Sequence, residues 1–541
     1  MTIAEFVART IRDAGVELVF GIPGGEVATL LEAFHETGIQ FILTSHEAGA
    51  AFMADAYFRR TGKLCAVLTT LGPGATNAIS GAAQALLDRS SILFLTGSVE
   101  YQLRGIYSHQ VLDHVSLFQP VTKWSQCLTV DNVAYSLQKA LGLVKAYPYG
   151  PVHLDIPSDV AMAAMPEGDN RIAAVHSAPD PWDSDSVDEI LNILKTSHNP
   201  IAVLGLDAAT QETASLLTRV VEAYALPVFT TYKAKGVLDE AHPLNLGPIG
   251  LSPRYDRVAF DCLRNADVVL TLGLDAVELR SEWLTVWPSL PVMDIGPIPG
   301  RFPGFPTRRS ASALVSAFLN RMLQEKVDPY DVSSQVAEIR EQHRAIIQSA
   351  DALIPSRTTG CLAPHSVLKV VDEECHGAVI TIDTGAMRIA ANHLVHASQP
   401  NFILQSNGLG TMGYALPAAI GAQFADADQP VVALTGDAGL LMLLGELSVA
   451  AAHSLPIIVV VFVDASLALI NLKQSRMHYH HVGVDVTVPD FARVAEQFGG
   501  HGYHVHSLEE FRAQLHETIG RRQGLTVIHV PIDPTSYQAL M

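Results

Sequence analysis

Two aspartates near the end of the sequence are spaced as ligands for a magnesium ion and a diphosphate. Asp437 lies in the stretch Thr435-Gly436-Asp437-Ala438-Gly439, and Asp464 follows the apolar run 455–463. Magnesium prefers oxygen ligands, usually one or two carboxylates completed by phosphate oxygens and water. Glycine lets the backbone come close to phosphates because it has no Cβ. The pair therefore indicates a magnesium-diphosphate site; the alternative is that these are ordinary loop acids of a βαβ unit.

A strand-helix-strand pattern must position these two aspartates. Residues 431–434 form a short β-branched run, 440–452 carry apolar residues at helical spacing, and 456–463 form an apolar run of strand length. A right-handed crossover between parallel strands brings both strand ends to one edge of the sheet, where open α/β sheets bind ligands. We therefore expect Asp437 and Asp464 to lie side by side.

Composition and charge disfavour nucleic-acid-binding and membrane-binding classes of protein. The 541-residue chain has 35 Lys and Arg against 55 Asp and Glu, a net charge of -20, which disfavours a nucleic-acid or anionic-membrane surface. The N-terminus lacks a basic-then-apolar signal, and no apolar run is long enough to span a bilayer, so we expect a cytoplasmic protein without a membrane span. The five cysteines lack C-x-x-C spacing, which favours reduced thiols. We expect small molecules as binding partners.

Strand and helix patterns alternate through three blocks, which predicts three doubly wound parallel-sheet α/β domains at 1–165, 186–325 and 360–541. The polar segment 166–185, which contains three prolines, is typical of a linker. Strands are expected near Leu18, Phe41, Cys65, Ile92 and 153–156 in the first block, near Ile201, Val228, Val268 and Val292 in the second, and near Val379, Phe402, Val431, Ile457 and Val527 in the third.

Two glycine-rich segments each allow two interpretations. Gly408 to Gly413 follows a strand and opens an apolar helix, so it formally satisfies the G-x-G-x-x-G dinucleotide fingerprint. The next strand, however, ends at Asp437 inside a second phosphate-like loop, which argues against a dinucleotide. Leu71 to Asn77 lies between a strand and a helix, where backbone N–H groups can face an anion, or where the chain simply turns.

Two helix starts in the first block carry glutamates. Thr2-x-x-Glu5 is a capping box that begins the first helix. Glu47 heads the alanine-rich helix 48–57, and burial there would disfavour its charged form and suit a carboxyl group that passes protons. The alternative role of Glu47 is a favourable charge at a helix N-terminus.

Taken together, these segments resemble thiamine-diphosphate enzymes of the acetohydroxyacid synthase and pyruvate oxidase group. The resemblance extends in order over nearly the whole chain. It implies a first domain that binds the aminopyrimidine ring, a central domain that is structural or binds a nucleotide, and a third that binds diphosphate and Mg2+. It also implies a homodimer or a dimer of dimers, that is a homotetramer, with active sites at the subunit interface. The segments that carry it are 20–24, 45–47, 71–77, 408–413, and Gly436-Asp437 with Asp464.

The resemblance assigns roles to individual residues. Glu47 would hydrogen-bond the aminopyrimidine of a cofactor held by the partner subunit. Met412 would support the bent cofactor, and the Gly410 carbonyl would accept from its amino group. Asp437, Asp464 and the Ser466 carbonyl would bind Mg2+. The remaining cofactor contacts would come from Gly436, Ala438, Gly439, Ala386 and Met387.

The implied reaction is decarboxylation of a 2-oxo acid followed by carboligation to a second carbonyl compound, as in acetolactate synthesis. Release of an aldehyde without ligation and a non-catalytic cofactor-binding paralogue are the alternatives. Gln110 matches a substrate-facing glutamine, and His109 beside it could shuttle protons or be a solvated bystander. The substrate pocket would include Lys473, Leu469 and Ile470.

Several positions depart from the family pattern. Ala438 replaces a glycine, and Asp464 replaces an asparagine while keeping a metal ligand. Ser158 replaces a basic residue and Lys473 a tryptophan that selects the acceptor, so the substrate is open. Lys473 is either part of a solvated basic face or a partner for a second anionic group on the substrate. The flavin-binding segment is replaced by 273–280, so bound FAD is not expected.

Overall fold

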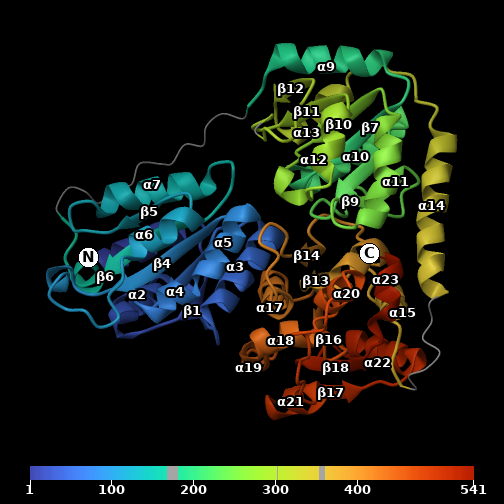
Figure 1. Ribbon diagram of the computed structural model, residues 1–541. Helices are drawn as coiled ribbons and strands as arrows, with labels where there is room; N and C mark the ends of the chain where they lie inside the picture. The colour runs from blue at the N-terminus through green and yellow to red at the C-terminus, as the bar shows by residue number, and fades with distance from the viewer. Residues whose placement is uncertain (167–180, 301, 353–359, 541) are drawn as a thin grey trace.

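The computed structural model describes residues 1–166, 181–300, 302–352 and 360–540. These residues form three domains, each built on a six-stranded sheet whose neighbouring strands pair in parallel. Figure 1 shows the first domain at the left, the central domain at the upper right and the third domain below it. The predicted fold class is confirmed. The linker expected over 166–185 lies mostly outside the described residues.

The first domain has the strand order β2-β1-β3-β4-β6-β5. The expected capping box is present, since Thr2 Oγ1 accepts the Glu5 N–H at 3.2 Å. The strands are β1 (Leu18–Ile22), β2 (Gln40–Leu43), β3 (Cys65–Thr69), β4 (Ile92–Ser98), β5 (Ser125–Cys127) and β6 (Val152–Pro157). The helices are α1 (Ile3–Asp13), α2 (Ala28–Thr37), α3 (Glu47–Thr61), α4 (Pro73–Asn77), α5 (Ile79–Leu87), α6 (His114–Phe118), α7 (Val133–Lys145) and α8 (Ser158–Met162).

The third domain repeats this order as β14-β13-β15-β16-β18-β17. Its strands are β13 (Val379–Ile382), β14 (Ile403–Gln405), β15 (Val431–Gly436), β16 (Ile457–Val463), β17 (His501–His504) and β18 (Thr526–Pro531). Its helices are α15 (Pro364–Glu374), α16 (Ala386–Leu394), α17 (Ala415–Ala425), α18 (Asp437–Met442), α19 (Leu447–Ala452), α20 (Ala468–Arg476), α21 (Phe491–Gln497), α22 (Leu508–Arg521) and α23 (Tyr537–Leu540).

The central domain has a different order, β12-β11-β10-β7-β8-β9. After it, α14 (Ser333–Asp351) runs alongside the central and third domains (Figure 1). The strands are β7 (Pro200–Leu204), β8 (Val228–Thr231), β9 (Asn245–Ile249), β10 (Val268–Leu272), β11 (Val292–Gly296) and β12 (Arg309–Ser312). The helices are α9 (Ser184–Thr196), α10 (Gln211–Tyr224), α11 (Pro253–Arg264), α12 (Trp283–Val286) and α13 (Val315–Met322).

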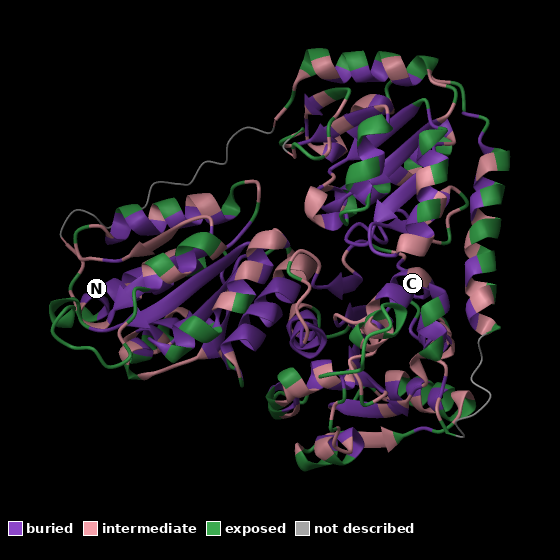
Figure 2. Ribbon diagram, viewed as in Figure 1, coloured by how far each residue is buried: buried purple, intermediate pink, exposed green. Residues whose placement is uncertain are grey.

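Within the described residues, four strands were missing from the sequence expectations: β5, β9, β12 and β17. Each lies at an edge of its sheet. β5 is half-buried throughout and β17 alternates only between exposed and half-buried residues, so neither carries an apolar run. Figure 2 shows the contrast with the interior strands, which are buried almost throughout. Edge strands need only one partner and can remain polar, which hides β5 and β17 from a search for apolar runs.

The first and third domains are joined by α3 and α17, two alanine-rich helices that pack together. A Cβ on Gly421 would lie 2.1 Å from the Met53 carbonyl oxygen, so the two backbones approach closely there. Tyr414 Oη donates to Asp55 at 2.6 Å beside this contact. The two helices share one apolar core. None of the described helices has both the length and the apolar character that a bilayer span requires.

Candidate active site

Asp437 and Asp464 lie side by side at one edge of the third sheet, as the sequence predicts. Their strands, β15 and β16, are adjacent and parallel, with Gly436 opposite Phe462. Asp437 is buried, and its Oδ2 accepts the N–H of Asp464 at 3.1 Å and of Ala465 at 2.7 Å. One carboxylate therefore orders the loop that carries the other.

The loop after β16 holds an unusual backbone conformation. Ala465 has a φ of 54°, a left-handed conformation that costs a residue with a Cβ roughly 1–3 kcal/mol. This conformation accompanies the hydrogen bond from the Ala465 N–H to Asp437. The Ser466 N–H then donates to Asp464 Oδ1 at 3.0 Å. Such strain is common at ligand sites, and here it brings Asp437, Asp464 and Ser466 together.

The electrostatics of this acid pair suit a divalent cation. Burial and the neighbouring Asp437 raise the pKa of Asp464 to about 7, and burial raises the pKa of Asp437. Two desolvated carboxylates so close together disfavour each other's charge. A cation between them would stabilise both charges, and an all-oxygen donor set is the one that Mg2+ prefers.

A third aspartate, Asp383, was not singled out from the sequence. It follows β13, and it accepts from the Gly413 N–H at 2.9 Å and from Thr435 Oγ1 at 2.8 Å. A Cβ on Gly439 would lie 2.3 Å from its carboxylate, so glycine is required there. Burial raises the pKa of Asp383 to about 6. The signal was available, because Asp383, like Asp437 and Asp464, directly follows a buried strand.

An open polar cradle lies beside these acids. A Cβ on Gly385 or Gly436 would meet nothing within 4 Å. The hydroxyl of Thr384 and the amide of Asn407 are buried and have no hydrogen-bond partner among the described residues. Ala386 and Met387 lie in the first turn of α16, at the N-terminus of that helix. Orphaned donors and a helix N-terminus fit an anionic group such as a diphosphate.

The loop 408–413 is held by residues from all three domains. Asp88 of the first domain accepts the Gly408 N–H at 2.7 Å and pairs with Lys233 of the central domain at 2.8 Å. Gly410 has a φ of +66°, and Met412 is half-buried. The segment that satisfies a dinucleotide fingerprint is therefore an interdomain loop whose end is fixed by Asp383.

Glu47 begins α3 and is only 5% exposed. Its Oε2 accepts from Asn77 Nδ2 at 3.0 Å, so the segment 71–77 holds this carboxylate. His46 caps the helix, with its Nδ1 accepting the Ala48 N–H at 3.1 Å. In the single chain no hydrogen bond or ion pair between described residues joins Glu47 to Asp437 or Asp464. Glu47 and the acid pair therefore belong to two separate parts of the fold.

A second buried glutamate, Glu446, reaches from the third domain to the start of α3. It accepts the N–H of Ser45 at 3.2 Å and of His46 at 3.0 Å. A Cβ on Gly49 would lie 2.1 Å from its carboxylate. Burial, with a contribution from Glu47, raises the pKa of Glu446 to about 7. No local pattern predicts this role, because the partner backbone is distant in sequence.

His109 and Gln110 lie in an exposed loop of the first domain. Gln110 has a φ of 58°, and its backbone lies against Gly72, where a Cβ would come 2.9 Å from the Gln110 carbonyl oxygen. The His109 ring stands edge-on to Tyr107. Below this loop lies a cavity of about 340 Å³, and its lining includes Leu71, Arg104, Gln110, His114 and Asp155.

A hydrogen-bonded network orders the base of this cavity. His114 Nε2 accepts the Gly72 N–H at 3.1 Å, so Nδ1 carries the proton and donates to Asp155 at 2.9 Å. Arg104 donates to the other Asp155 oxygen at 2.9 Å. Although burial opposes it, His114 keeps the pKa of Asp155 below its usual range. The sequence interpretation did not single out Arg104 or His114, which become partners only in the fold.

The short helix α20 presents a mixed surface beside Asp464. Leu469 packs inward near Ile389, whereas Ile470 and Lys473 are exposed. Lys473 makes no ion pair with another described residue. Of the three pocket residues expected here, Ile470 and Lys473 are therefore open to a ligand and Leu469 is packed against the core.

Known proteins resemble this chain over nearly its whole length. Models of the N-terminal, central and C-terminal domains of thiamine pyrophosphate enzymes match residues 1–117, 187–300 and 383–530. The large subunit of acetolactate synthase isozyme 3 of Escherichia coli is 30% identical over 556 residues, which cover 99% of this chain and 95% of that protein. The isozyme 2 large subunit of the same organism is 28% identical, covering 98% and 95%. Acetolactate synthase of Bacillus subtilis is 27% identical, covering 98% and 93%.

Proposed function

The chain belongs to the thiamine pyrophosphate enzyme family, and from that premise we propose that it decarboxylates a 2-oxo acid and joins the remaining fragment to a second carbonyl compound. The observation that carries this proposal is the pair formed by buried Asp437 and half-buried Asp464 beside an open polar cradle. Acetolactate-type ligation is favoured over simple decarboxylation because the similar proteins are acetolactate synthases.

The third domain would hold the cofactor and its metal. Asp437, Asp464 and the Ser466 carbonyl would ligate Mg2+, and Gly436, Ala438 and Gly439 would lie along the diphosphate. Ala386, Met387, Gly410 and Met412 complete the proposed contacts. When bound, thiamine diphosphate supplies an electron sink for the pair released as carbon dioxide leaves. Asp383 positions this site through Gly413 and Thr435.

Glu47 would hold and release the proton that activates the cofactor. Its burial and its hydrogen bond from Asn77 fix the carboxylate in one place, as a proton-transfer group requires. Glu446 holds the backbone just before Glu47 and places a second buried carboxyl nearby. A buried carboxyl held in this way favours a catalytic role over a non-catalytic paralogue.

The cavity under Gln110 would take the substrate. A volume of about 340 Å³ is within the range of small-molecule sites. Arg104 brings a positive charge to its wall, oriented by Asp155 and by Ser98 Oγ at 2.8 Å. An arginine there suits the carboxylate of a 2-oxo acid. His109 lies in the same exposed loop as Gln110 and would be the proton shuttle.

The enzyme would act as a homodimer or a dimer of dimers. Apolar side chains beside the site residues remain in solvent in the single chain: Leu43 is 58%, Ile106 83% and Met442 57% exposed. Leu43 shortly precedes Glu47, and Met442 ends the helix that Asp437 begins. Burial of such side chains by a second copy would complete a site to which Glu47 comes from one subunit and Asp437 from the other.

Turnover with product analysis tests the proposed reaction. The protein with thiamine diphosphate and Mg2+ is incubated with pyruvate and a panel of 2-oxo acids, and the products are identified by NMR. Acetolactate or another ligation product supports the proposal, whereas an aldehyde alone supports the non-ligating alternative. No consumption of any 2-oxo acid would overturn the enzyme assignment.

Subunit complementation tests the shared site. Glu47→Gln and Asp437→Ala homodimers are each inactive by expectation, and random exchange gives heterodimers in which one of two sites is intact. About a quarter of wild-type activity is then recovered. If each site lies within one chain, mixing restores nothing.

A further inference from the structure

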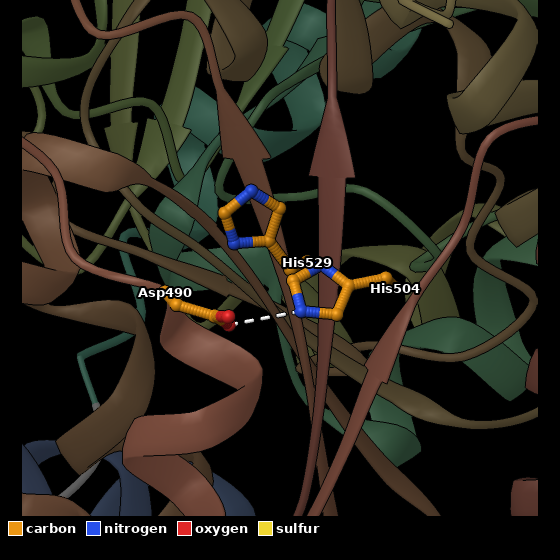
Figure 3. A group of neighbouring side chains, drawn as sticks. All are labelled: Asp490, His504 and His529. Atoms are coloured by element: carbon orange, nitrogen blue, oxygen red, sulfur yellow. Dashed lines mark ion pairs between the residues drawn. The ribbon is translucent and has the colours of Figure 1, made fainter.

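Two histidines and an aspartate converge at the outer edge of the third sheet. His504 ends β17 and is paired in register with His529 on β18. Asp490 caps α21, the helix packed on these strands. Figure 3 shows the three side chains turned toward one another. One ligand atom from each lies within 4.8 Å of the others.

The local backbone fixes this geometry. A Cβ on Gly502 would lie 2.0 Å from the Ala492 carbonyl oxygen, so β17 touches α21 at this point. His504 is two residues further along and faces the same side of the sheet. Its Nε2 lies 2.9 Å from Asp490 Oδ1, and the two imidazole rings are 5.0 Å apart. Tetrahedral zinc with bonds of 2.0–2.1 Å needs ligand atoms about 3.3 Å apart. The ligand atoms here lie within 4.8 Å of one another, so they would have to move closer by about 1.5 Å at most.

The side chain of His529 gives a second observation, independent of the distances, that favours a ligand at this cluster. Its Nδ1 is buried and has no hydrogen-bond partner among the described residues. A buried orphan nitrogen is costly unless it meets a ligand, water or ion.

We propose that Asp490, His504 and His529 form a zinc-type metal site that fastens the edge strand β17 to α21. Two imidazoles and one carboxylate are typical ligands for Zn2+, Co2+ or Ni2+ and are unlike the all-oxygen set that suits Mg2+. The side chains of His504 and Asp490 are 42% and 36% exposed, so water can complete the coordination. The site is separate from the Asp437 and Asp464 pair and independent of the proposed reaction.

Zinc binding by the metal-stripped full chain tests the proposal. The protein is saturated with Mg2+ and thiamine diphosphate, titrated with Zn2+ and assayed for bound zinc. We expect one tight equivalent per chain, a rise in Tm on binding, and a tetrahedral visible spectrum with Co2+. His504→Ala should weaken this equivalent at least about 100-fold, since even mutation of residues that orient ligands costs 10–100-fold. Unchanged zinc binding in His504→Ala would overturn the proposal, as would the absence of a tight equivalent in the wild type.

Three variants make the result specific. Asp490→Asn keeps the helix cap, which asparagine can also form, but removes the charged ligand, so zinc affinity should fall while stability without metal is retained. His481→Ala removes an imidazole from the exposed loop after α20 and should leave the equivalent in place. Asp437→Ala should also leave it in place. Loss of the equivalent in Asp437→Ala or His481→Ala, with retention in Asp490→Asn, would assign the zinc elsewhere and overturn the proposal.

Discussion

The first and third domains share one strand order but differ in chemistry at the carboxyl ends of their strands. In the third sheet, β13, β15 and β16 lead into Asp383, Asp437 and Asp464. The equivalent strands of the first sheet, β1, β3 and β4, lead into Pro23, Thr70 and Val99. Equivalent helices, α3 and α17, then pack the two domains together. Topology alone therefore does not make the site; the residues at the strand ends do.

This difference gives the two domains different proposed roles. The acidic edge of the third domain suits metal and diphosphate, whereas the first domain offers a buried carboxyl at a helix start and a cavity. Five substitutions test this difference between the two domains.

Asp437→Ala should have the largest effect. It removes a proposed metal ligand and the acceptor for Asp464 and Ala465, so affinity for thiamine diphosphate with Mg2+ should fall at least about 100-fold and turnover should reach background. Calorimetric titration of the cofactor measures this. Asp428→Ala, an exposed aspartate of the same domain, is the control. If Asp437→Ala bound the cofactor as tightly as the wild type, the sheet edge of the third domain would not be part of the cofactor site.

Glu47→Gln should separate catalysis from binding. Loss of a proton-transfer group lowers kcat by about 10²–10⁴-fold, while cofactor affinity stays within a few-fold. Steady-state kinetics and the same titration measure both quantities, with exposed Glu36→Gln as the control. If Glu47→Gln lowers cofactor affinity as strongly as Asp437→Ala does, the first and third domains do not have the separate roles proposed for them.

Glu446→Gln should reduce the pH dependence of stability at the junction of the two domains. Since burial raises its pKa from 4.5 to about 7, Glu446 contributes stability that is complete below pH 4.5 and lost as pH rises through 7. The loss is about 3 kcal/mol. Urea midpoints at pH 5 and pH 8 should therefore differ less in Glu446→Gln than in the wild type. Equal differences would show that Glu446 has no such role.

Gly421→Ala should weaken the pairing of α3 with α17. The new Cβ would meet the Met53 carbonyl, and such overpacking costs about 1–3 kcal/mol. Gly520→Ala in α22 is the matched control, because its Cβ meets nothing within 4 Å and alanine favours a helix by up to about 1 kcal/mol. Thermal unfolding of both variants gives the comparison; a Gly421→Ala protein as stable as the control would contradict the close approach.

Lys473→Met should have the smallest effect, confined to substrate choice. An exposed ion pair contributes up to about 1 kcal/mol, so kcat/KM for a dianionic 2-oxo acid should fall several-fold and for a neutral-chain one should not change. Arg476→Met on the same helix is the control. If the ratio of variant to wild-type kcat/KM were the same for both substrates, Lys473 would be part of a solvated basic face.

The βαβ unit of Asp437 and Asp464, the three-domain α/β fold and the family could all be predicted from the sequence. Interior strands such as β16 are continuous apolar runs because both faces are buried, and glycines at strand ends mark close backbone approach. Asp383 was also readable, since it follows a buried strand as the other two acids do.

Features that depend on partners distant in sequence became visible only in the folded structure. Edge strands such as β17 are polar enough to escape a search for apolar runs, and Glu446 acquires its role from a backbone about 400 residues away. Asp88 meets Lys233 only where three domains join. His504 and His529 become neighbours through strand register, which a one-residue slip would abolish. Local patterns report burial and turns, whereas pairing across the fold is set by packing, which no short stretch of sequence contains.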